Sequence, residues 1–284
     1  MGLSKAVFHR YLPSPTANFA KLGVITLHYY ALCILIGIIA ALVIGSHRWR
    51  KAKGDPSELL EMAIYVIPAG VVGGRLYHVL TTPELYFGKG GHPIDALKIW
   101  QGGMGIWGAV ALGALTTYLL FKIKPRSVTF ATAADALAPA LLVAQGIGRW
   151  GNWFNKELFG SPSTLPWALK IPTAYRPHGF ENFATFHPTF LYESIWCILA
   201  AAALIFTPQV KKLRAGSTFL LYVLLYSVGR IWIEALRIDR AHLLLGVRLN
   251  VWVALLCAVV SLVAIVRRQH RHFKRPISEL TSHL

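Results

Sequence analysis

The chain has 284 residues, of which 55% are hydrophobic and only 14% charged, and its formal net charge is +17. Soluble domains carry about 25% charged residues, so this composition indicates an integral membrane protein and argues against a soluble one. The basic residues form short clusters between apolar stretches. This pattern speaks against a nucleic-acid partner and favours contact with anionic membrane lipids.

Seven apolar stretches are long enough for membrane-spanning helices, which need about 20 mostly apolar residues. In chain order they are Val24–Gly45, Leu59–Leu80, Gly103–Phe121, Val128–Ile147, Thr189–Phe206, Thr218–Leu236 and Leu249–Val266. Arg75 and Asp135 interrupt the second and the fourth stretch. The predicted fold class is therefore all-α: a polytopic integral membrane protein with about seven transmembrane helices in one domain, residues 1–284.

The short connections rich in Lys and Arg predict the orientation, because such connections face the cytoplasm. Dense basic segments follow the first, third, fifth and seventh stretches, within residues 47–51, 122–126, 211–214 and 267–275. We therefore expect the N-terminus outside and the C-terminus in the cytoplasm. Residues 1–23 become an outer-face segment, 149–188 a long outer-face loop, and 267–284 a basic cytoplasmic tail. The loop is rich in Trp, Phe and Pro, which favours a position on the outer membrane interface.

Metal and cofactor chemistry finds little support in the sequence. Cys33, Cys197 and Cys257 each lie in an apolar stretch, and no CxxC pair occurs. No HExxH, GxSxG, Walker loop or nucleotide-binding GxGxxG is present. We therefore expect neither a metal nor a cofactor.

Residues 148–160 carry the first polar motif, at the end of the fourth stretch. Arg149 is followed within two turns by Asn152, Asn155 and Glu157. Arginine binds phosphate in bidentate geometry and the Asn side chains add donors, so one interpretation is a phosphate-bearing ligand. The alternative is an arginine that snorkels to the interface beside a glycine-rich turn.

The sixth stretch carries a second polar motif. Arg230, Glu234 and Arg237 are spaced i, i+4, i+7 and share one helix face. A charge inside a span costs about 2.5–3.5 kcal/mol and usually faces a functional cavity. The stripe has one surplus positive charge, which favours an anionic ligand, whereas the alternative is an ion pair that locks two helices together.

Two further segments allow two interpretations each. Glu193 lies about one turn into the fifth stretch, where it serves either as a counter-ion for an arginine or as an acid or base, and His187 before it is more typical of a structural residue. The glycines of Gly73-Gly74-Arg75 and of Gln101–Gly105 permit close backbone approach, either for helix packing or for a ligand.

Together these segments resemble the prolipoprotein diacylglyceryl transferase family. The pattern G-R-x-G-N-x-x-N-x-E-x-x-G at Gly148–Gly160 is similar to that family's signature. Supporting matches follow in the family's order: His28-Tyr29-Tyr30, Gly73-Gly74-Arg75, Trp100-Gln101-Gly102-Gly103-Met104, Asp135 with Pro139, His187-Pro188, Leu191-Tyr192-Glu193, and Arg230 with Glu234 and Arg237.

The resemblance implies the first step of bacterial lipoprotein maturation, at the outer face of the plasma (inner) membrane. The diacylglyceryl group of phosphatidylglycerol passes to the lipobox cysteine thiol of a prolipoprotein signal peptide, and glycerol phosphate leaves. The implied partners are phosphatidylglycerol, prolipoproteins and membrane lipids. By motif position, the implied catalytic residues are Tyr30, Arg149, Glu193 and Arg230. The implied phosphatidylglycerol-binding residues are Arg149, Asn152, Glu157, Gly160, Arg230, Glu234, Arg237, Gly102 and Gly103.

The chemistry of this reaction fits the residues, because preorganised arginines stabilise a leaving phosphate ester in a site of low dielectric. A transporter or channel for an anionic solute is the alternative function. It would also place arginine at membrane depth, but it predicts an internal repeat, which the sequence does not show.

One position departs from the family pattern. Where the family has Gly-Gly-Met-x-x-His-Gly, this chain has Trp107 in place of the histidine. Tryptophan cannot accept a proton, so the sequence leaves the thiol base open. The positive field of Arg149, Arg230 and Arg237 is one route to a thiolate, and a carboxylate, Glu193 or Glu234, is the other.

Overall fold

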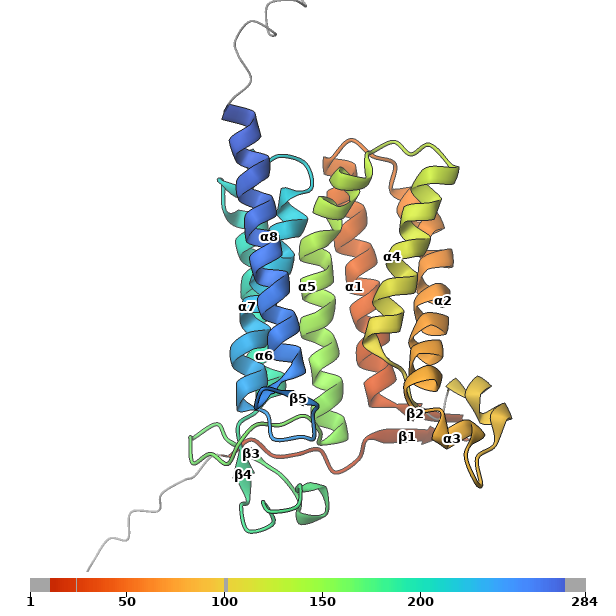
Figure 1. Cartoon of the computed structure of the whole chain (residues 1–284), viewed down its shortest axis with the longest axis vertical. Coiled ribbons are helices and arrows are strands. Elements are labelled where there is room, and N and C mark those ends of the chain that lie inside the picture. The colour runs from red at the N-terminus through yellow and green to blue at the C-terminus, as the bar shows by residue number, and fades with distance from the viewer. Residues whose placement is uncertain (1–10, 24, 100–101, 274–284) are drawn as a thin grey trace, which may run out of the picture. The chain divides into compact units, whose positions relative to one another are not determined.

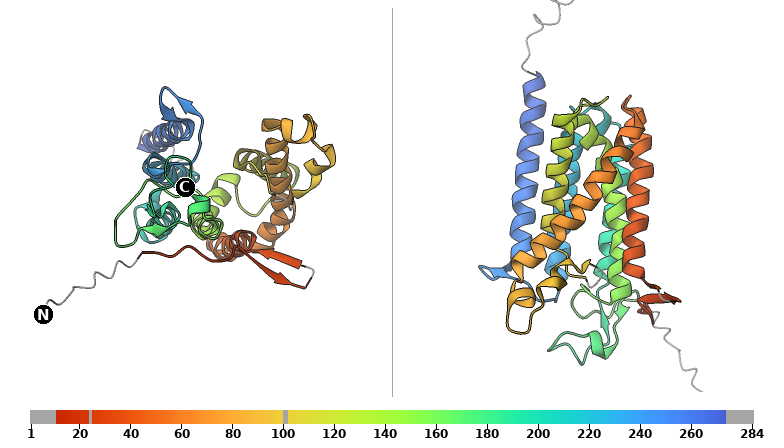
Figure 2. Two further views of the ribbon diagram at one scale, coloured as in Figure 1. Left: turned by 90° about the horizontal axis from the view of Figure 1, so that it is seen from below. Right: turned by 90° about the vertical axis from the view of Figure 1, so that its right-hand side faces the viewer.

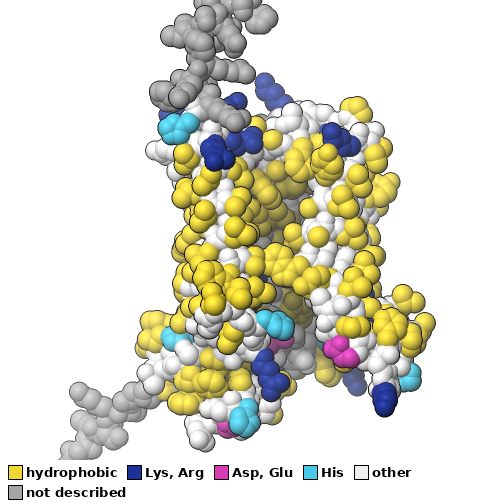
Figure 3. Space-filling view, viewed as in Figure 1, with side chains coloured by type: hydrophobic (Ala, Val, Ile, Leu, Met, Phe, Trp, Pro, Cys, Tyr) yellow, Lys and Arg dark blue, Asp and Glu magenta, His cyan; other side chains and the backbone are white. Residues whose placement is uncertain are grey.

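The computed structural model describes residues 11–23, 25–99 and 102–273. Within this part of the chain, seven helices are long and apolar enough to cross a membrane, which confirms the all-α, polytopic class. They are α1 (Tyr29–Lys51), α2 (Pro56–Thr81), α4 (Ile106–Ile123), α5 (Phe130–Asn155), α6 (Thr189–Phe206), α7 (Ser217–Leu236) and α8 (Leu249–Phe273). On the face drawn in Figure 3, hydrophobic side chains cover the middle of the helices, and Lys and Arg gather at their ends.

Short elements occupy the connections. α3 (Glu84–Phe87) and η1 (Pro93–Leu97) lie between α2 and α4. Three antiparallel strand pairs accompany the helices: β1 (Phe19–Leu22) with β2 (Ile25–His28), β3 (Leu169–Lys170) with β4 (Thr185–Phe186), and β5 (Leu243–Leu244) with β6 (Val247–Arg248). Figure 2 shows the first pair projecting from the start of α1. The single-turn helices η3 (Thr173–Tyr175) and η4 (Val210–Lys212) complete the connections.

The bounds of several helices differ from the predicted stretches, and α8, for example, continues to Phe273 instead of ending at Val266. α1 begins only at Tyr29, because the residues before it form the β1–β2 hairpin. α4 begins at Ile106, since Gly102 and Gly103 adopt positive φ angles of 85° and 75°, which a helix does not accommodate. α5 continues to Asn155 instead of ending near residue 147, so the first polar motif begins on a helix and not in a loop.

The chain forms two compact units, one from the described parts of Met1–Ile44 and Ala134–Leu284, the other from Gly45–Ala133. In the second unit α2 and α4 lie side by side (Figure 1). A Cβ atom on Gly73 would lie 2.3 Å from the Gly108 carbonyl oxygen, and one on Gly108 would lie 2.1 Å from that of Gly73. Helix packing therefore explains Gly73, as one of its two interpretations predicted.

In the first unit, small residues bring α5 against its neighbours. Gly37 places α1 close to the Ala144 carbonyl of α5, and Gly146 places α5 close to the Ser194 carbonyl of α6. Helices α6, α7 and α8 lie side by side (Figure 1). This packing sets the three helices α5, α6 and α7 around a common interior, where the charged residues of the polar motifs meet.

Asp135 has a structural role inside α5. Its carboxylate accepts hydrogen bonds from the backbone N–H groups of Gly216, at 2.6 Å, and Phe219, at 2.8 Å. These donors belong to the first turn of α7, where the helix dipole favours a negative charge. Asp135 therefore caps α7 from a neighbouring helix, which explains an acidic residue in an otherwise apolar span.

Basic segments meet at one end of each unit. In the second unit, Lys124 and Arg126 both pair with Glu61 of α2, at 3.0 and 2.9 Å. In the first unit, Arg268 of α8 donates to the Ala215 carbonyl just before α7, at 2.6 Å. Each unit thus gathers basic connections at one of its ends.

The connection after α5 is folded around its own small core. Phe159, Leu169, Ile171, Phe186 and Phe190 pack together and are buried. Leu12 adds a short parallel bridge, since its N–H donates to Ala168 and its carbonyl accepts from Lys170, both at 2.9 Å. The connection therefore offers a fixed surface at the end of α5, α6 and α7 (Figure 1).

Candidate active site

Glu193 joins the polar motifs of three helices. Its Oε1 lies 2.8 Å from Nη2 of Arg149 on α5, and its Oε2 lies 3.6 Å from Nη1 of Arg230 on α7. Tyr226 completes the group: Arg149 donates to its hydroxyl at 3.2 Å, and the hydroxyl donates to Glu193 at 3.4 Å. Glu193 is buried, so its charge is balanced by two arginines and one hydroxyl rather than by water.

Glu234 continues this network toward the end of α7. It is fully buried and pairs with Arg230 through Oε2. Arg237 approaches the same oxygen at 3.2 Å, while Arg248 and Asn250 approach Oε1 at 2.8 and 3.0 Å. Four donor groups thus converge on one carboxylate, which supports the helix-locking interpretation for this part of the stripe.

Asp239 closes the network outside the spans. It accepts a bidentate pair from Arg237, at 2.7 and 2.8 Å, and a further bond from Arg248 at 3.0 Å. Burial raises the pKa of Asp239, but the hydrogen bond and charge of Arg237 outweigh it and hold this pKa below its ordinary value. Asp239 is therefore ionised at neutral pH. The guanidinium of Arg237 is paired with two carboxylates, those of Glu234 and Asp239.

The network has one positive charge in excess, because four arginines face three carboxylates. The arginines are Arg149, Arg230, Arg237 and Arg248, and the carboxylates are Glu193, Glu234 and Asp239. The side chains of Arg149, Arg230 and Arg248 are 23%, 16% and 14% exposed, whereas that of Arg237 is only 8% exposed. Arg248 is bound by Glu234 at 2.8 Å and by Asp239 at 3.0 Å, so the surplus charge is most accessible at Arg149 and Arg230, and an anion is the ligand that would compensate it.

Glu157 is held beside this network by amides. Asn152 and Asn155 both donate to its Oε1, at 2.9 and 3.2 Å, and its own N–H donates to the Asn152 carbonyl at 3.1 Å. The neighbours Lys156 and Leu158 have φ angles of 56° and 57°, a conformation that costs energy for residues other than glycine. The turn after α5 therefore holds an exposed carboxylate whose second oxygen, having no hydrogen-bond partner among the described residues, can accept a hydroxyl.

Tyr30 and Gly160 are placed by close backbone contacts. A Cβ atom on Gly151 would lie 2.5 Å from the ring of Tyr30, so Gly151 lets α1 bring this ring against α5. Gly160 donates to the His187 carbonyl at 2.9 Å, and a Cβ atom there would lie 2.9 Å from the His187 Cβ. Gly160 thus serves close packing between the turn and the starting point of α6.

His187 is oriented by its neighbour Tyr192, whose hydroxyl lies 3.1 Å from the ring Nδ1. Burial lowers the pKa of His187 below the usual histidine value, so the ring is neutral at pH 7. This arrangement is that of a structural histidine between the turn and α6.

Gly102 and Gly103 lie in the second unit, where they hold Arg75. Nη1 of Arg75 donates to the carbonyls of Gly102, at 2.5 Å, and Gly103, at 2.9 Å. Its other nitrogens donate to the carbonyls of Asp95 and of Ala96, the latter at 2.8 Å. Arg75 therefore organises the α2–α4 connection. Trp100 and Gln101 lie outside the described residues, and Trp107 is 48% exposed at the start of α4.

Sequence reasoning missed four members of the network: Tyr226, Asp239, Arg248 and Asn250. Tyr226 precedes Arg230 by four residues, so extending the i, i+4 stripe by one turn would have found it. No periodicity points to Arg248, which lies at the boundary of the last span.

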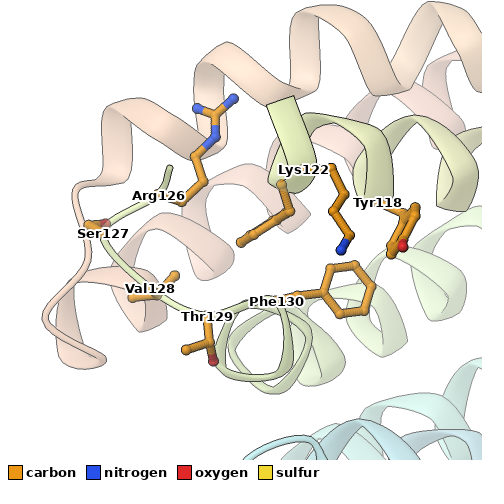
Figure 4. Close-up of a pocket in the computed structure, with 8 residues that line it drawn as sticks. Tyr118, Lys122, Arg126, Ser127, Val128, Thr129 and Phe130 are labelled. Carbon is orange, nitrogen blue, oxygen red and sulfur yellow. The ribbon is translucent and has the colours of Figure 1, made fainter. Parts of the chain in front are cut away.

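Neither of two surface grooves is lined by a residue of the arginine network. One, of about 510 Å³, is lined by Tyr118, Phe121, Lys122, Arg126, Ser127, Val128, Thr129 and Phe130 (Figure 4). In it the Lys122 amine lies 5.7 Å from the Tyr118 ring centroid, and Arg126 is paired with Glu61. The other groove, of about 550 Å³, is lined by residues 162–165, residues 183–185 and His187. Among the described residues, no three His, Cys, Asp or Glu side chains gather as metal ligands would.

Comparison with known proteins gives consistent matches over most of the chain. The family model for prolipoprotein diacylglyceryl transferase matches residues 17–267. Phosphatidylglycerol–prolipoprotein diacylglyceryl transferase 2 of Streptomyces coelicolor is 47% identical over 262 residues, 92% of this chain and 82% of the relative. The enzyme of that name from Bifidobacterium adolescentis is 45% identical over 90% of this chain and 79% of its own, and that from Cutibacterium acnes is 46% identical over 93% and 88%.

Proposed function

The chain belongs to the prolipoprotein diacylglyceryl transferase family, and on that premise we propose that it transfers the diacylglyceryl group of phosphatidylglycerol to a lipoprotein precursor. The acceptor is the thiol of the lipobox cysteine. Its sulfur forms a bond to the terminal glyceryl carbon, the bond from that carbon to the phosphate oxygen breaks, and glycerol phosphate leaves with the electron pair. The transporter alternative draws no support from the names of the relatives.

The surplus positive charge at Arg149 and Arg230 carries this proposal. Both guanidiniums share Glu193 and both remain partly exposed. A lipid phosphate bound there would accept donors from two helices and neutralise the excess charge. As the carbon–oxygen bond breaks, negative charge grows on the phosphate, and fixed guanidiniums at membrane depth stabilise it strongly. Arg149 and Arg230 thus act as catalytic groups, with Glu193 and Tyr226 setting their geometry.

Glu157 and Tyr30 have roles at the edges of this site in the proposal. The free carboxylate oxygen of Glu157 accepts a hydroxyl of the lipid's glycerol headgroup, and Asn152 keeps that carboxylate in place. Gly160 permits the tight turn that carries Glu157. Tyr30, which lies on α1 and contacts Gly151, lines one side of the site.

In this proposal, the positive charge of Arg149 and Arg230 promotes deprotonation of the substrate thiol to the thiolate. Glu193 and Glu234 are each bound by arginines from both sides, so neither is a free base. A thiol has a pKa of about 8.5, which nearby positive charge lowers. The proton then leaves to water as the cysteine approaches Arg149 and Arg230.

The proposal also implies the membrane in which the enzyme lies and its orientation there. The chain is a multi-pass protein of the bacterial plasma membrane, with residues 1–284 acting as one catalytic domain. Its N-terminus lies outside and its tail, residues 267–284, in the cytoplasm. Because the basic connections then face the cytoplasm, the network at the opposite ends of α5, α6 and α7 lies near the outer leaflet.

A direct assay tests the function. Purified protein is incubated in vesicles with phosphatidylglycerol and a lipobox peptide, and mass spectrometry detects the thioether-linked diacylglyceryl peptide. The Cys→Ser peptide and vesicles of phosphatidylcholine serve as negative controls. Lipidation that needs both the thiol and phosphatidylglycerol supports the proposal, and no product with active relatives run in parallel refutes it.

A further inference from the structure

A second polar row continues from the arginine network toward the middle of the helices. Tyr222, Tyr226 and Arg230 are spaced i, i+4, i+8 on α7, and Gln145 and Arg149 are spaced i, i+4 on α5. The α5 row and the α7 row are joined by two hydrogen bonds. Arg149 donates to Tyr226 at 3.2 Å, and Gln145 Nε2 donates to the Tyr222 hydroxyl at 3.1 Å. At about 1.5 Å of rise per residue, the Gln145–Tyr222 pair lies about 6 Å deeper than the pair above it.

The Gln145–Tyr222 pair has unused hydrogen-bonding capacity. Gln145 Oε1 is buried and has no partner among the described residues. The Tyr222 hydroxyl accepts from Gln145, but its own hydrogen finds no acceptor in the described part of the chain. Rotating the amide by half a turn makes Tyr222 the donor and leaves the amide N–H₂ free instead. Either arrangement keeps one donor available, and native proteins leave few such buried groups unpaired.

We propose that this pair donates a hydrogen bond to an ester carbonyl of the lipid's diacylglyceryl group, and thereby positions the glyceryl carbon for attack. The inference rests on the proposed function, which places the lipid phosphate at Arg149 and Arg230. The ester carbonyls lie a few bonds from that phosphate on the acyl side, a span comparable with one helical turn. As whole residues, Tyr222 and Gln145 are both partly exposed, although the Gln145 Oε1 atom itself is buried.

The proposal makes the enzyme sensitive to the linkage of its lipid. A carbonyl oxygen is a strong acceptor in the position described, whereas a dialkyl ether lipid with the same headgroup lacks that oxygen. A purely structural bond between α5 and α7 would hold the helices together but would not distinguish the two lipids.

A two-by-two comparison tests the contact. Wild type and Tyr222→Phe are assayed for peptide lipidation with diester and with diether phosphatidylglycerol of equal chain length. We expect each single change to lower kcat/KM about fivefold, the equivalent of about 1 kcal/mol. We expect the double change to be no worse than either single one, because both remove the same hydrogen bond. Tyr65→Phe, an exposed tyrosine on α2, is the matched control and should retain the ester preference.

Gln145→Leu provides a second, independent variant, since it removes the amide that fixes the Tyr222 hydroxyl. It should reduce the ester preference of the enzyme in the same way as Tyr222→Phe. Losses that multiply to about 25-fold, the product of two fivefold effects, would overturn the inference and leave the pair a helix-packing bond. Wild type that lipidates no peptide with the diester lipid would instead refute the proposed function itself.

Discussion

Replacing Glu193 with Gln separates its two interpretations, counter-ion and acid or base. The amide keeps the size of the side chain but removes the negative charge between Arg149 and Arg230. The network then has two positive charges in excess instead of one. Breaking a buried ion pair by removing one partner costs about 3–5 kcal/mol. Because the two arginines are 23% and 16% exposed, we expect the lower end, about 3 kcal/mol.

A loss of about 3 kcal/mol in the free energy of unfolding lowers the melting temperature by roughly 6–12 °C, because a chain of about this length loses about 2–4 °C per kcal/mol. The assay is thermal unfolding of purified wild type and Glu193→Gln in the same detergent, with Glu181→Gln as an exposed control carboxylate. Adding phosphatidylglycerol should restore more stability to Glu193→Gln than to wild type, since the lipid phosphate supplies the missing charge.

The counter-ion role would be refuted by a variant that melts like wild type but has lost its activity. That result would identify Glu193 as the base that takes the thiol proton. A variant that keeps both stability and activity would place Glu193 outside the mechanism.

Three further predictions follow from the site. Arg149→Lys and Arg230→Lys should each lower turnover about 100-fold or more while the protein still folds, because lysine keeps the charge but lacks the planar guanidinium. Near wild-type rates in both variants would exclude bidentate phosphate binding. Trp107→Phe should keep most activity, and the pH profile of turnover at saturating lipid should show no acidic limb at or below pH 6.5. Burial lowers the pKa of His187, so a histidine base at this position would produce such a limb. A limb that disappears in His187→Gln would therefore identify His187 as the base. Thr164→Cys, in a background without the native cysteines, should react with an impermeant maleimide on intact spheroplasts, and labelling only after lysis would contradict the orientation.

Much of the fold was predictable from hydropathy alone. A bilayer demands about 20 apolar residues per span, and the seven stretches of the sequence become the seven long helices. Their ends were less predictable. Gly102 and Gly103 delay α4 through their backbone conformation, whereas α5 continues through Gly146 and Gly151, which permit its close packing against Ser194 and Tyr30. Hydropathy carries no information on either effect.

The sequence by itself also predicted most of the candidate site residues, because charged side chains in apolar spans are costly and therefore few. It could not determine which charges meet. Only the packing of α5, α6 and α7 places Glu193 between Arg149 and Arg230. The same packing adds Arg248 to the partners of Glu234. An ion pair forms between side chains that neighbouring helices bring within about 4 Å, and helix neighbours are chosen by shape and small residues over the whole bundle, which no local pattern encodes.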